Sequence, residues 1–364
     1  MSNLFVLAAG GSGGHLFPAQ ALATELMRRG RSVVVMTDAR GHNFGKAFPG
    51  AEIKVIPAAN FSTRSPIKLI GAAWTIGRGI LAARAELRRL RPRAVVGFGG
   101  YSSLPVMIAA KQARIPSAVH EQNSVPGRVN RFLSRRVARV AASFPFARFA
   151  PENPEKIVFT GLPVRAEVMA LRDMPFVAPG LNDPINILIF GGSQGARALS
   201  EVVPRALARL PVDIKTRLHV TQQARVEDLD EVKGIYREAN IKAEVETFYT
   251  DLPRRMAAAH LVVARSGAST LGELTVIGRP SILVPYPFAM DDHQTANADV
   301  LEKAGAAWVF KQNALDPEKL SSILDDILLH PEQLTKRAAA AKAMGRPDAA
   351  ARLADVVENL GGAS

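Results

Sequence analysis

The chain has 364 residues, of which 48% are hydrophobic and none is cysteine. This composition is typical of a globular chain that is long enough for two cores, and the absence of cysteine excludes disulfide bonds and thiolate metal sites. We expect no membrane-spanning helix, because no run of about 18 apolar residues occurs, and no signal peptide. The formal net charge is +13, but residues 1–162 carry +16 (23 Lys/Arg, 7 Asp/Glu) and residues 163–364 carry −3 (23 and 26), which predicts an anionic partner for the first half.

Short apolar runs alternate with longer helix-like segments in the first half of the chain. This alternation is typical of a parallel, doubly wound sheet. The strands are expected at residues 4–9, 32–36, 94–97, 117–120 and 139–142. Residues 151–186, which are rich in Pro, Gly and Asn, then resemble a joint between domains.

The same plan restarts at residues 186–203, NILIFGGSQGARALSEVV, where an apolar strand leads through a glycine turn into a helix. Further strands are expected at residues 217–220, 244–248, 261–264, 281–284 and 306–310. The sequence therefore predicts an α/β protein with two tandem Rossmann-like domains facing a central cleft. We expect residues 1–162 with 343–364 to form an N-terminal domain and residues 163–342 a C-terminal domain.

The first glycine turn, Gly10–Gly14, allows a ligand to approach the backbone closely, and the helix after it favours negative charge. The turn misses the dinucleotide fingerprint G-x-G-x-x-G because Leu16 stands at the third position. Asp38, after the second strand, nevertheless keeps a nicotinamide-binding fold open as an alternative. His15 begins the helix, where the helix dipole favours the neutral imidazole, so it is a candidate general base or a structural histidine.

Two further motifs lie in the basic half. GFGGYSSLP, residues 97–105, places Gly99, Gly100 and Tyr101 at a second glycine turn, which can hold a diphosphate together with the first. HEQNSVPG, residues 120–127, ends an apolar strand with polar side chains, which in that position normally point into a cleft. These motifs make Asn123 a candidate sugar contact and Glu121 a second candidate base.

In the second half, GGSQG at residues 191–195 matches the nucleophile elbow G-x-S-x-G. A serine hydrolase with Ser193 as nucleophile and His260 or His293 as its base is therefore an alternative. Phosphate binding by Ser193 and the turn's amides is the preferred interpretation, because it accounts for both glycine turns.

A polar turn leads into a helix in RSGASTLGEL, residues 265–274. Ser269 and Thr270 can therefore offer their amides and hydroxyls to a phosphate. Glu273, one turn further, can accept the ribose hydroxyls, and Gln294 in PFAMDDHQTANA is a candidate sugar contact. We expect no metal site, because no histidine pair has ligand spacing and the D-x-D at Asp228 lies on a charged helix face.

Residues 65–92, SPIKLIGAAWTIGRGILAARAELRRLRP, predict a long helix that begins near Ser65 and Pro66. Residues 61–93 contain eight Lys/Arg and one Glu. A basic helix with Trp and aliphatic residues is typical of a membrane-surface element, although one stripe of it is expected to pack on the sheet. We expect this helix to contact an anionic membrane through Trp74, Ile76, Arg78 and Ile80, with residues 130–140 enlarging the basic surface.

Taken together, GGSGGH, GFGGY, HEQN, GLPVR, GGSQGA, RSGASTLGE and DDHQTANA resemble the MurG family, in consistent order and nearly end to end. The resemblance implies the GT-B glycosyltransferase architecture, with the donor bound mainly by the C-terminal domain and the acceptor by the N-terminal one. It implies an inverting transfer of N-acetylglucosamine from its UDP donor to the 4-hydroxyl of the MurNAc of lipid I, which yields lipid II for peptidoglycan synthesis. No cofactor or metal is implied, and the location implied is the cytoplasmic face of the bacterial inner membrane.

The resemblance also assigns roles by position. It implies donor contacts from Ser12, Gly13, Gly14, Asn123, Arg165, Ser193, Tyr249, Ala268, Ser269, Thr270, Leu271, Gly272, Glu273 and Gln294, with the backbone at Tyr249 meeting uracil. We expect the acceptor at Gly99, Gly100 and Tyr101, and catalysis by His15 or Glu121. The sequence departs from the family at Ser12, where Thr is common, and at Leu162, where Asn is common.

Three other classes of protein fit parts of the sequence. A UDP-N-acetylglucosamine epimerase shares this type of fold, and the serine hydrolase rests on Ser193. A nucleic-acid binder fits the basic charge but lacks aromatic stacking clusters, since aromatic residues make up only 6% of the chain. The expected partners are therefore UDP-N-acetylglucosamine, lipid I and an anionic membrane, with other cell-wall synthesis proteins left open and no nucleic acid.

Overall fold

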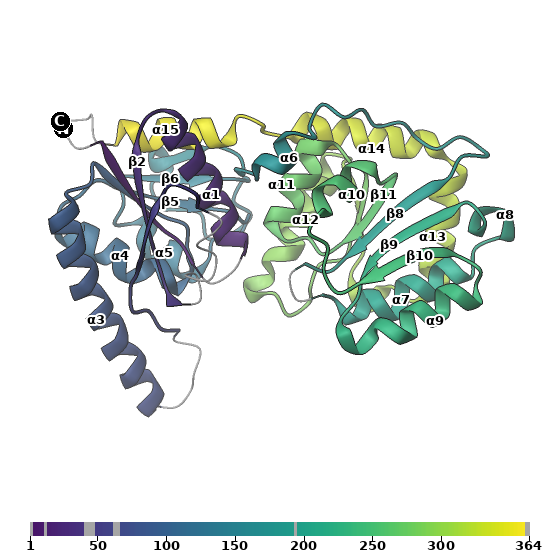
Figure 1. Ribbon diagram of the computed structural model, residues 1–364, viewed down its shortest axis with the longest axis horizontal. Helices are drawn as coiled ribbons and strands as arrows, with labels where there is room; N and C mark the ends of the chain where they lie inside the picture. The colour runs from purple at the N-terminus through teal and green to yellow at the C-terminus, as the bar shows by residue number, and fades with distance from the viewer. Residues whose placement is uncertain (1–2, 11–12, 40–47, 61–65, 193–194, 361–364) are drawn as a thin grey trace. The chain divides into compact units, whose positions relative to one another are not determined.

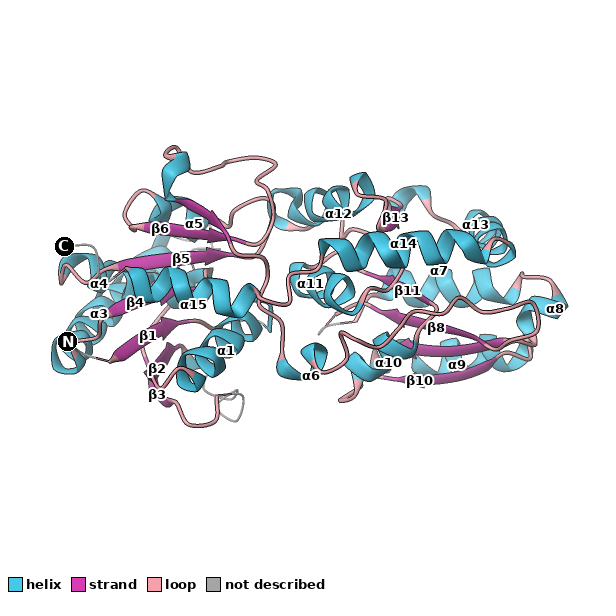
Figure 2. Cartoon of the chain, turned by 90° about the horizontal axis from the view of Figure 1, so that it is seen from above, coloured by secondary structure: helices cyan, strands magenta, loops and turns pink. Residues whose placement is uncertain are grey.

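The computed structural model describes residues 3–10, 13–39, 48–60, 66–192 and 195–360. The chain divides into two compact units, Met1–Arg165 with Arg346–Ser364, and Ala166–Gly345. Each unit contains a parallel sheet with helices on both faces (Figures 1 and 2). The two tandem Rossmann-like units expected from the sequence are therefore confirmed.

The first unit is built on a seven-stranded sheet in the order β3-β2-β1-β4-β5-β6-β7. Its strands are β1 (Leu4–Ala8), β2 (Ser32–Thr37), β3 (Glu52–Val55), β4 (Ala94–Gly97), β5 (Ser117–Glu121), β6 (Arg139–Ala142) and β7 (Ile157–Phe159). All pairs are parallel, and the central strands are buried along almost their whole length because helices cover both faces. The chain order reverses between β1 and β4, so a ligand site is expected at their carboxyl ends.

Helices α1 (Gly13–Arg28) and α15 (Ala349–Asn359) cover one face of this sheet, and α3 (Pro66–Leu90) with α4 (Gly100–Gln112) covers the other. A short helix, α5 (Arg128–Ser134), follows β5. Helix α15 brings the end of the described chain back to the first unit (Figure 2). Its Glu358 pairs with Arg29 and Arg31, at 2.7 and 2.6 Å, which fixes α15 beside α1.

The second unit has a six-stranded parallel sheet in the order β10-β9-β8-β11-β12-β13. Its strands are β8 (Ile185–Phe190), β9 (Leu218–Gln223), β10 (Lys242–Glu246), β11 (Leu261–Ala264), β12 (Ser281–Leu283) and β13 (Ala307–Val309). Its helices are α6 (Ala166–Met169), α7 (Arg197–Ala208), α8 (Val212–Lys215), α9 (Leu229–Glu238), α10 (Leu252–Ala258), α11 (Ala268–Ile277), α12 (His293–Lys303), α13 (Pro317–Leu329) and α14 (Pro331–Met344). The order reverses between β8 and β11, which places a second ligand site at the carboxyl ends of these strands.

Three sequence predictions need correction. The edge strands β3 and β7 were not predicted, because β3 alternates polar and apolar residues and β7 is only three residues long. Since β7 pairs with β6, residues 157–159 complete the first sheet and the joint expected over residues 151–186 begins later. Strand β10 ends at Glu246 rather than at Phe248, because Val245 is the buried residue and Phe248 is 67% exposed.

Helix α3 confirms the long helix, but two of the expected membrane contacts are wrong. Ile76 is 7% exposed and Ile80 packs against the core, because both lie on the side of α3 that faces the unit. The exposed apolar residues are Ile70, Trp74 and Leu81. No helix in the described part of the chain combines the length and the apolar character that a membrane crossing requires.

Candidate active site

One candidate site lies in the first unit at the carboxyl ends of β1 and β4, where the structure brings the glycine turn at the start of α4 against His15 of α1. A methyl group at Gly99 would lie 3.3 Å from His15 Cε1, and one at Gly100 would lie 3.4 Å from His15 Cδ2. Both glycines have positive φ angles, +85° and +70°. The bare backbone before α4 therefore packs against the half-buried His15 side chain in a conformation that favours glycine.

Glu121, at the end of β5, organises the turn that follows it. One carboxylate oxygen accepts hydrogen bonds from the backbone N and the Nδ2 of Asn123, at 2.9 and 3.3 Å. The other accepts from Gly127 N at 3.0 Å and from Asn130 Nδ2 at 2.8 Å. A carboxylate offers about four acceptor positions. These four donors occupy them, so the buried carboxylate of Glu121 fixes the position of Asn123.

His120, one residue earlier, is a second buried histidine that the sequence analysis did not single out. Its Nδ1 lies 3.3 Å from Gln122 Nε2, and its Nε2 lies 3.3 Å from Ser143 Oγ. Burial, with a smaller contribution from the charge of His15, lowers the pKa of His120 to about 4. His120 is therefore neutral near pH 7. It was missed because it lies inside an otherwise apolar strand. Asn130, on α5, was missed because its hydrogen bond to Glu121 depends on a turn that sequence spacing does not reveal.

A second candidate site, in the second unit, surrounds the first turn of α11. The N-cap of α11 is Gly267, which has no side chain to satisfy the first amides of the helix. Ser269 Oγ is buried and has no hydrogen-bond partner among the described residues. Glu273, one turn along, is 5% exposed. An uncapped helix N-terminus beside a hydroxyl and a carboxylate is suited to a phosphate and a ribose.

The rest of the motif around α11 differs in what it can offer a ligand. Ala268 is buried, Thr270 is half-buried, and the side chain of Leu271 is fully buried. Gly272 is also buried, so Leu271 and Gly272 belong to the packed side of the helix. The expected donor contacts of Leu271 and Gly272 therefore concern their backbone atoms, and they stay a prediction.

Gln294 is held beside this helix from two directions. Its Oε1 accepts a hydrogen bond from Tyr286 N at 3.0 Å, and its backbone oxygen accepts one from Ser266 Oγ at 2.8 Å. Because the side-chain oxygen is engaged, Nε2 is the group that Gln294 can offer to a ligand.

Tyr249 is anchored toward the interior of the second unit. Its hydroxyl lies 2.9 Å from Glu244 O and 3.3 Å from Gln222 O, and the guanidinium of Arg255 lies 4.3 Å from the ring centroid. Burial raises the pKa of Tyr249 above its usual value. The side chain of Tyr249 therefore has a structural role, and it is the backbone of this residue that can contact the nucleobase of a ligand.

Arg165 belongs to the first unit. Its guanidinium carbon is 4.5 Å from the ring centroid of Phe17, and the same ring lies 3.0 Å from the position of a methyl group at Gly13. Arg165 is thus placed near the start of α1, where Gly14 also lies. Ser12 and Ser193 lie outside the described residues.

The nicotinamide alternative and one of the two candidate bases of the serine hydrolase, His260, fit this geometry poorly. Asp38, which a nicotinamide site needs for the ribose, is buried and accepts a hydrogen bond from Ser102 Oγ at 2.9 Å. His260 bonds to Asn186 N at 2.9 Å, beside the amino end of β8, whereas the expected elbow follows the carboxyl end of that strand. Six strand residues span about 20 Å, so His260 cannot serve as the base of a nucleophile there. No cluster of metal-ligating side chains exists within the described ranges.

These features define a class of protein, the two-unit α/β enzymes that bind nucleotide sugars, and comparisons with known proteins narrow the class. Residues 5–142 match the glycosyltransferase family 28 N-terminal domain, and residues 186–353 match its C-terminal domain. A protein of Paramagnetospirillum magneticum, named UDP-N-acetylglucosamine–N-acetylmuramyl-(pentapeptide) pyrophosphoryl-undecaprenol N-acetylglucosamine transferase, is 49% identical over 98% of this chain and 96% of its own length. The transferase of the same name from Methylobacterium sp. (strain 4-46) is 52% identical over 97% of this chain and 96% of its own.

Solved structures agree. The crystal structure of Acinetobacter baumannii MurG matches 98% of this chain and 99% of its own with a TM-score of 0.80 and 30% identity. A UDP-GlcNAc 2-epimerase from Neisseria meningitidis matches with a TM-score of 0.69 at 13% identity, which reflects a shared fold alone. The chain belongs to the MurG family of glycosyltransferases.

Proposed function

We propose that this chain transfers N-acetylglucosamine from UDP-N-acetylglucosamine to the 4-hydroxyl of the MurNAc of lipid I, with inversion at the anomeric carbon. The observation that carries the proposal is the N-terminus of α11, which is uncapped and lies at the switch point of the second sheet next to the buried Glu273. The transferase names of relatives at 49% and 52% identity support the same reaction. The product is lipid II, the precursor of peptidoglycan.

The second unit is proposed to bind the donor. The first amides of α11, with Ser269 Oγ, hold the diphosphate, and Glu273 accepts the ribose hydroxyls. The backbone at Tyr249 meets uracil, and Gln294 donates to the sugar through Nε2. As the bond between the anomeric carbon and the phosphate oxygen breaks, the electron pair passes to UDP, and the helix N-terminus stabilises the charge that develops.

The first unit is proposed to bind the acceptor and to supply the base. The acceptor oxygen attacks the anomeric carbon from the face opposite UDP, and its proton passes to His15. The turn at Gly99, Gly100 and Tyr101 contributes backbone groups for the diphosphate of lipid I. Glu121 is the poorer candidate for the base because its oxygens already hold the turn that carries Asn123, so we assign it a positioning role.

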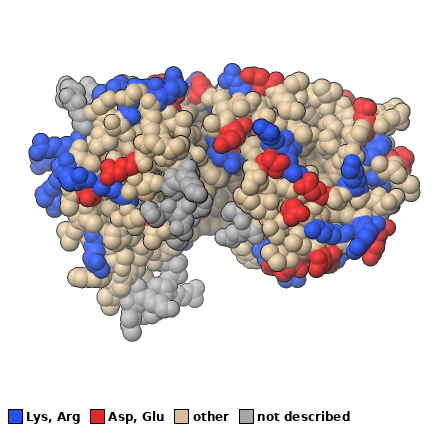
Figure 3. Space-filling view, viewed as in Figure 1, with Lys and Arg blue, Asp and Glu red and all other residues tan. Residues whose placement is uncertain are grey.

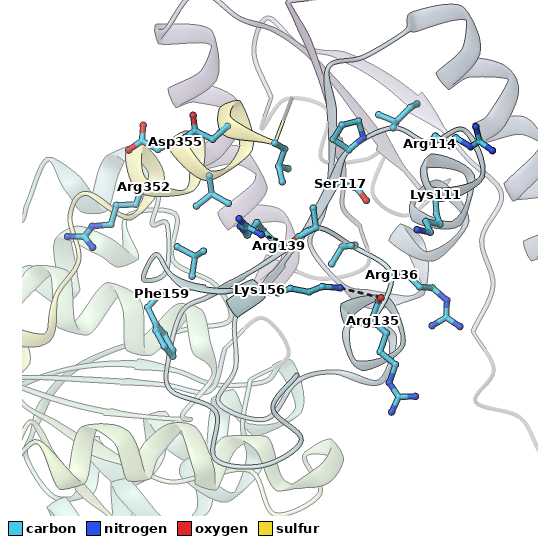
Figure 4. A pocket seen from close by; sticks show the side chains of 18 residues that line it. Lys111, Arg114, Ser117, Arg135, Arg136, Arg139, Lys156, Phe159, Arg352 and Asp355 are labelled. Atoms are coloured by element: carbon cyan, nitrogen blue, oxygen red, sulfur yellow. Dashed lines mark hydrogen bonds between the residues drawn. The ribbon is translucent and has the colours of Figure 1, made fainter. Parts of the chain in front are cut away.

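Charge supports the proposal that the first unit contacts an anionic membrane at the cytoplasmic face. Figure 3 shows Lys and Arg side chains gathered at the outer edge of this unit. A cavity of about 950 Å³ lies at the amino ends of β5, β6 and β7 (Figure 4). Five cations along it have no acidic partner in the described part of the chain: Lys111, Arg114, Arg136, Arg139 and Lys156. The exposed Ile70, Trp74 and Leu81 add apolar contacts.

The experiment that tests this function supplies radiolabelled UDP-N-acetylglucosamine with and without a lipid I analogue. We expect label to enter the lipid fraction only when the analogue is present, at a rate that EDTA does not lower. If the label remains on a nucleotide as an epimerised sugar, the chain is an epimerase and not a transferase. Label released as free sugar at equal rates with and without the analogue would indicate a hydrolase.

A further inference from the structure

Arg265, which follows β11, is a buried cation whose hydrogen bonds join the ends of three strands. Its guanidinium donates from Nη1 to Val284 O at 3.0 Å and to Pro285 O at 3.2 Å, and from Nη2 to Gln312 Oε1 at 2.6 Å. Val284 follows β12 and Gln312 follows β13, the next two strands in the sheet. One side chain, which is 8% exposed, therefore spans the carboxyl ends of three adjacent strands.

The hydrogen bonds of Arg265 require the shape of a guanidinium. Its three acceptors are neutral, two carbonyl oxygens and one amide oxygen, so the side chain is held by directed hydrogen bonds and not by a buried ion pair. Burial of the charge lowers the pKa of Arg265. The planar fork of Arg carries donors on both terminal nitrogens, whereas the ammonium of Lys is a single point. Only Arg can therefore bind the segments after β12 and β13 together.

The segment that Arg265 holds carries the amide that orients Gln294. Tyr286, directly after Pro285, donates its backbone N–H to Gln294 Oε1 at 3.0 Å, and its ring centroid lies 5.5 Å from the guanidinium carbon. Because an N–H is a donor, the amide oxygen of Gln294 faces it and Nε2 is turned away. Ser266, the neighbour of Arg265, donates from Oγ to Gln294 O at 2.8 Å. The backbone and the side chain of Gln294 are thus both fixed from residues 265–266.

We propose that Arg265 is a positioning residue for the donor sugar, because it fixes the segment that binds Gln294 Oε1 and so directs Gln294 Nε2 toward a sugar hydroxyl. The inference rests on the proposed function, in which Gln294 donates to the sugar. The first turn of α11, which is proposed to hold the diphosphate, is fixed instead by the packing of Ala268 and Leu271, which are 7% and 0% exposed. Loss of Arg265 therefore weakens the binding of UDP-N-acetylglucosamine more than the binding of UDP.

The test measures the affinities of UDP-N-acetylglucosamine and of UDP by calorimetry for the wild type and for Arg265→Met. We expect the ratio of the two affinities to fall about tenfold in Arg265→Met, because the sugar contact is lost and the nucleotide contacts stay. Arg279→Met is the matched control, since Arg279 is a buried arginine of the same unit that also donates to backbone carbonyls. It precedes β12 and so lies at the amino edge of the sheet. We expect Arg279→Met to lower the melting temperature and to leave the affinity ratio unchanged.

Two further variants test the connection to Gln294. Arg265→Lys keeps the charge but reaches fewer of the three acceptors, so the affinity ratio should fall about threefold, and this variant decides the matter if Arg265→Met does not fold. Gln294→Ala removes the proposed sugar contact itself. The double variant Arg265→Met with Gln294→Ala should therefore lose no more of the ratio than Gln294→Ala alone.

The outcomes separate this inference from the proposed function. A folded Arg265→Met or Arg265→Lys protein with the wild-type affinity ratio overturns the role of Arg265 alone. An equal fall of the ratio in Arg279→Met, or additive losses in the double variant, also overturns that role, because Arg265 would then only stabilise the unit. An unchanged ratio in Gln294→Ala overturns the sugar contact of the proposed function and this inference with it.

Discussion

At the scale of single residues, the two candidate bases of the first unit differ in their surroundings. His15 packs against the glycine turn at the start of α4, whereas the four acceptor positions of the Glu121 carboxylate are all used in hydrogen bonds to the segment that follows it. The sequence identified both as candidate bases because their residue types suit the chemistry. It could not separate them, because the separation depends on hydrogen bonds to Gly127 and Asn130.

Replacing each candidate base separates their roles. His15→Ala should lower kcat by about a hundredfold or more, the range of a general base, and leave the melting temperature nearly unchanged. Glu121→Gln should lower the free energy of unfolding by about 1–3 kcal/mol, because an amide cannot accept all four hydrogen bonds. The measurements are steady-state transfer kinetics and thermal unfolding of both variants. Near wild-type turnover in His15→Ala would dismiss it as the base.

The buried His120 makes stability depend on pH. Its pKa is about 4 in the folded chain and about 6.5 when unfolded, so between these values the unfolded chain binds the extra proton. The contribution of His120 to the free energy of unfolding is fully present above about pH 6.5. As the pH falls toward 4 this contribution is lost, which lowers the free energy of unfolding by about 3 kcal/mol in total. Urea unfolding at pH 7.5 and 5 should therefore show a smaller loss in His120→Gln than in the wild type. An equal loss in both would contradict this account.

At the scale of elements, apolar runs predicted the buried strands, and the glycine and polar motifs follow the carboxyl ends of β1, β4, β5, β8 and β11, as the sequence predicted. The edge strand β3 was missed because polar and apolar residues alternate in its four residues, and β7 because its apolar run is only three residues long. The hydrogen bonds of Gln223, at the end of β9, to Gly191 N and Thr247 O were also beyond sequence reasoning, since they depend on which strands become neighbours. Sequence therefore predicts the positions of functional segments better than the bonds that fix their spacing.

Arg279, which follows α11, makes hydrogen bonds that fix the spacing of separate segments in the second unit. It is 2% exposed, and its guanidinium donates to carbonyls of three segments, including Ala257 O at 2.8 Å, Gly278 O at 3.1 Å and Pro175 O at 3.3 Å. Burial lowers its pKa to about 10, so it stays charged. Arg279→Met should leave these carbonyls unpaired and lower the free energy of unfolding by about 2–4 kcal/mol.

Because Arg279 precedes β12, it lies at the amino edge of the sheet, away from the proposed donor site. KM for UDP-N-acetylglucosamine should therefore stay unchanged in Arg279→Met at temperatures where the variant is folded. A changed KM with wild-type stability would show that Arg279 acts on the site instead. Arg205→Met, at an exposed ion pair, is the control and should cost less than about 1 kcal/mol.

At the scale of the whole molecule, the charge is divided between the units: the positive excess lies in the first 162 residues, and the second half is slightly acidic. This division fits a donor site in one unit and an anionic lipid substrate at the other. Sedimentation with vesicles that contain anionic lipid should show weaker binding for Trp74→Ser, and binding should fall with salt. Ile76→Ala should instead lower stability, because this residue is buried.

Vesicle binding that is unchanged in Trp74→Ser and insensitive to salt would contradict the membrane-facing role of α3. The control is Val212→Ser, an apolar residue of the second unit that is 71% exposed. It removes a similarly exposed side chain from a part of the chain without the basic excess, so its binding should match the wild type.

The central claim is an inverting transfer between two bound substrates, and the configuration of the product tests it most directly. Lipid II formed from UDP-N-acetylglucosamine and a lipid I analogue can be isolated and the new glycosidic bond assigned by proton NMR. The account predicts a β-linkage to the 4-oxygen of MurNAc, with one UDP released for each bond formed. An α-linkage, or UDP release without a new glycosidic bond, would contradict it.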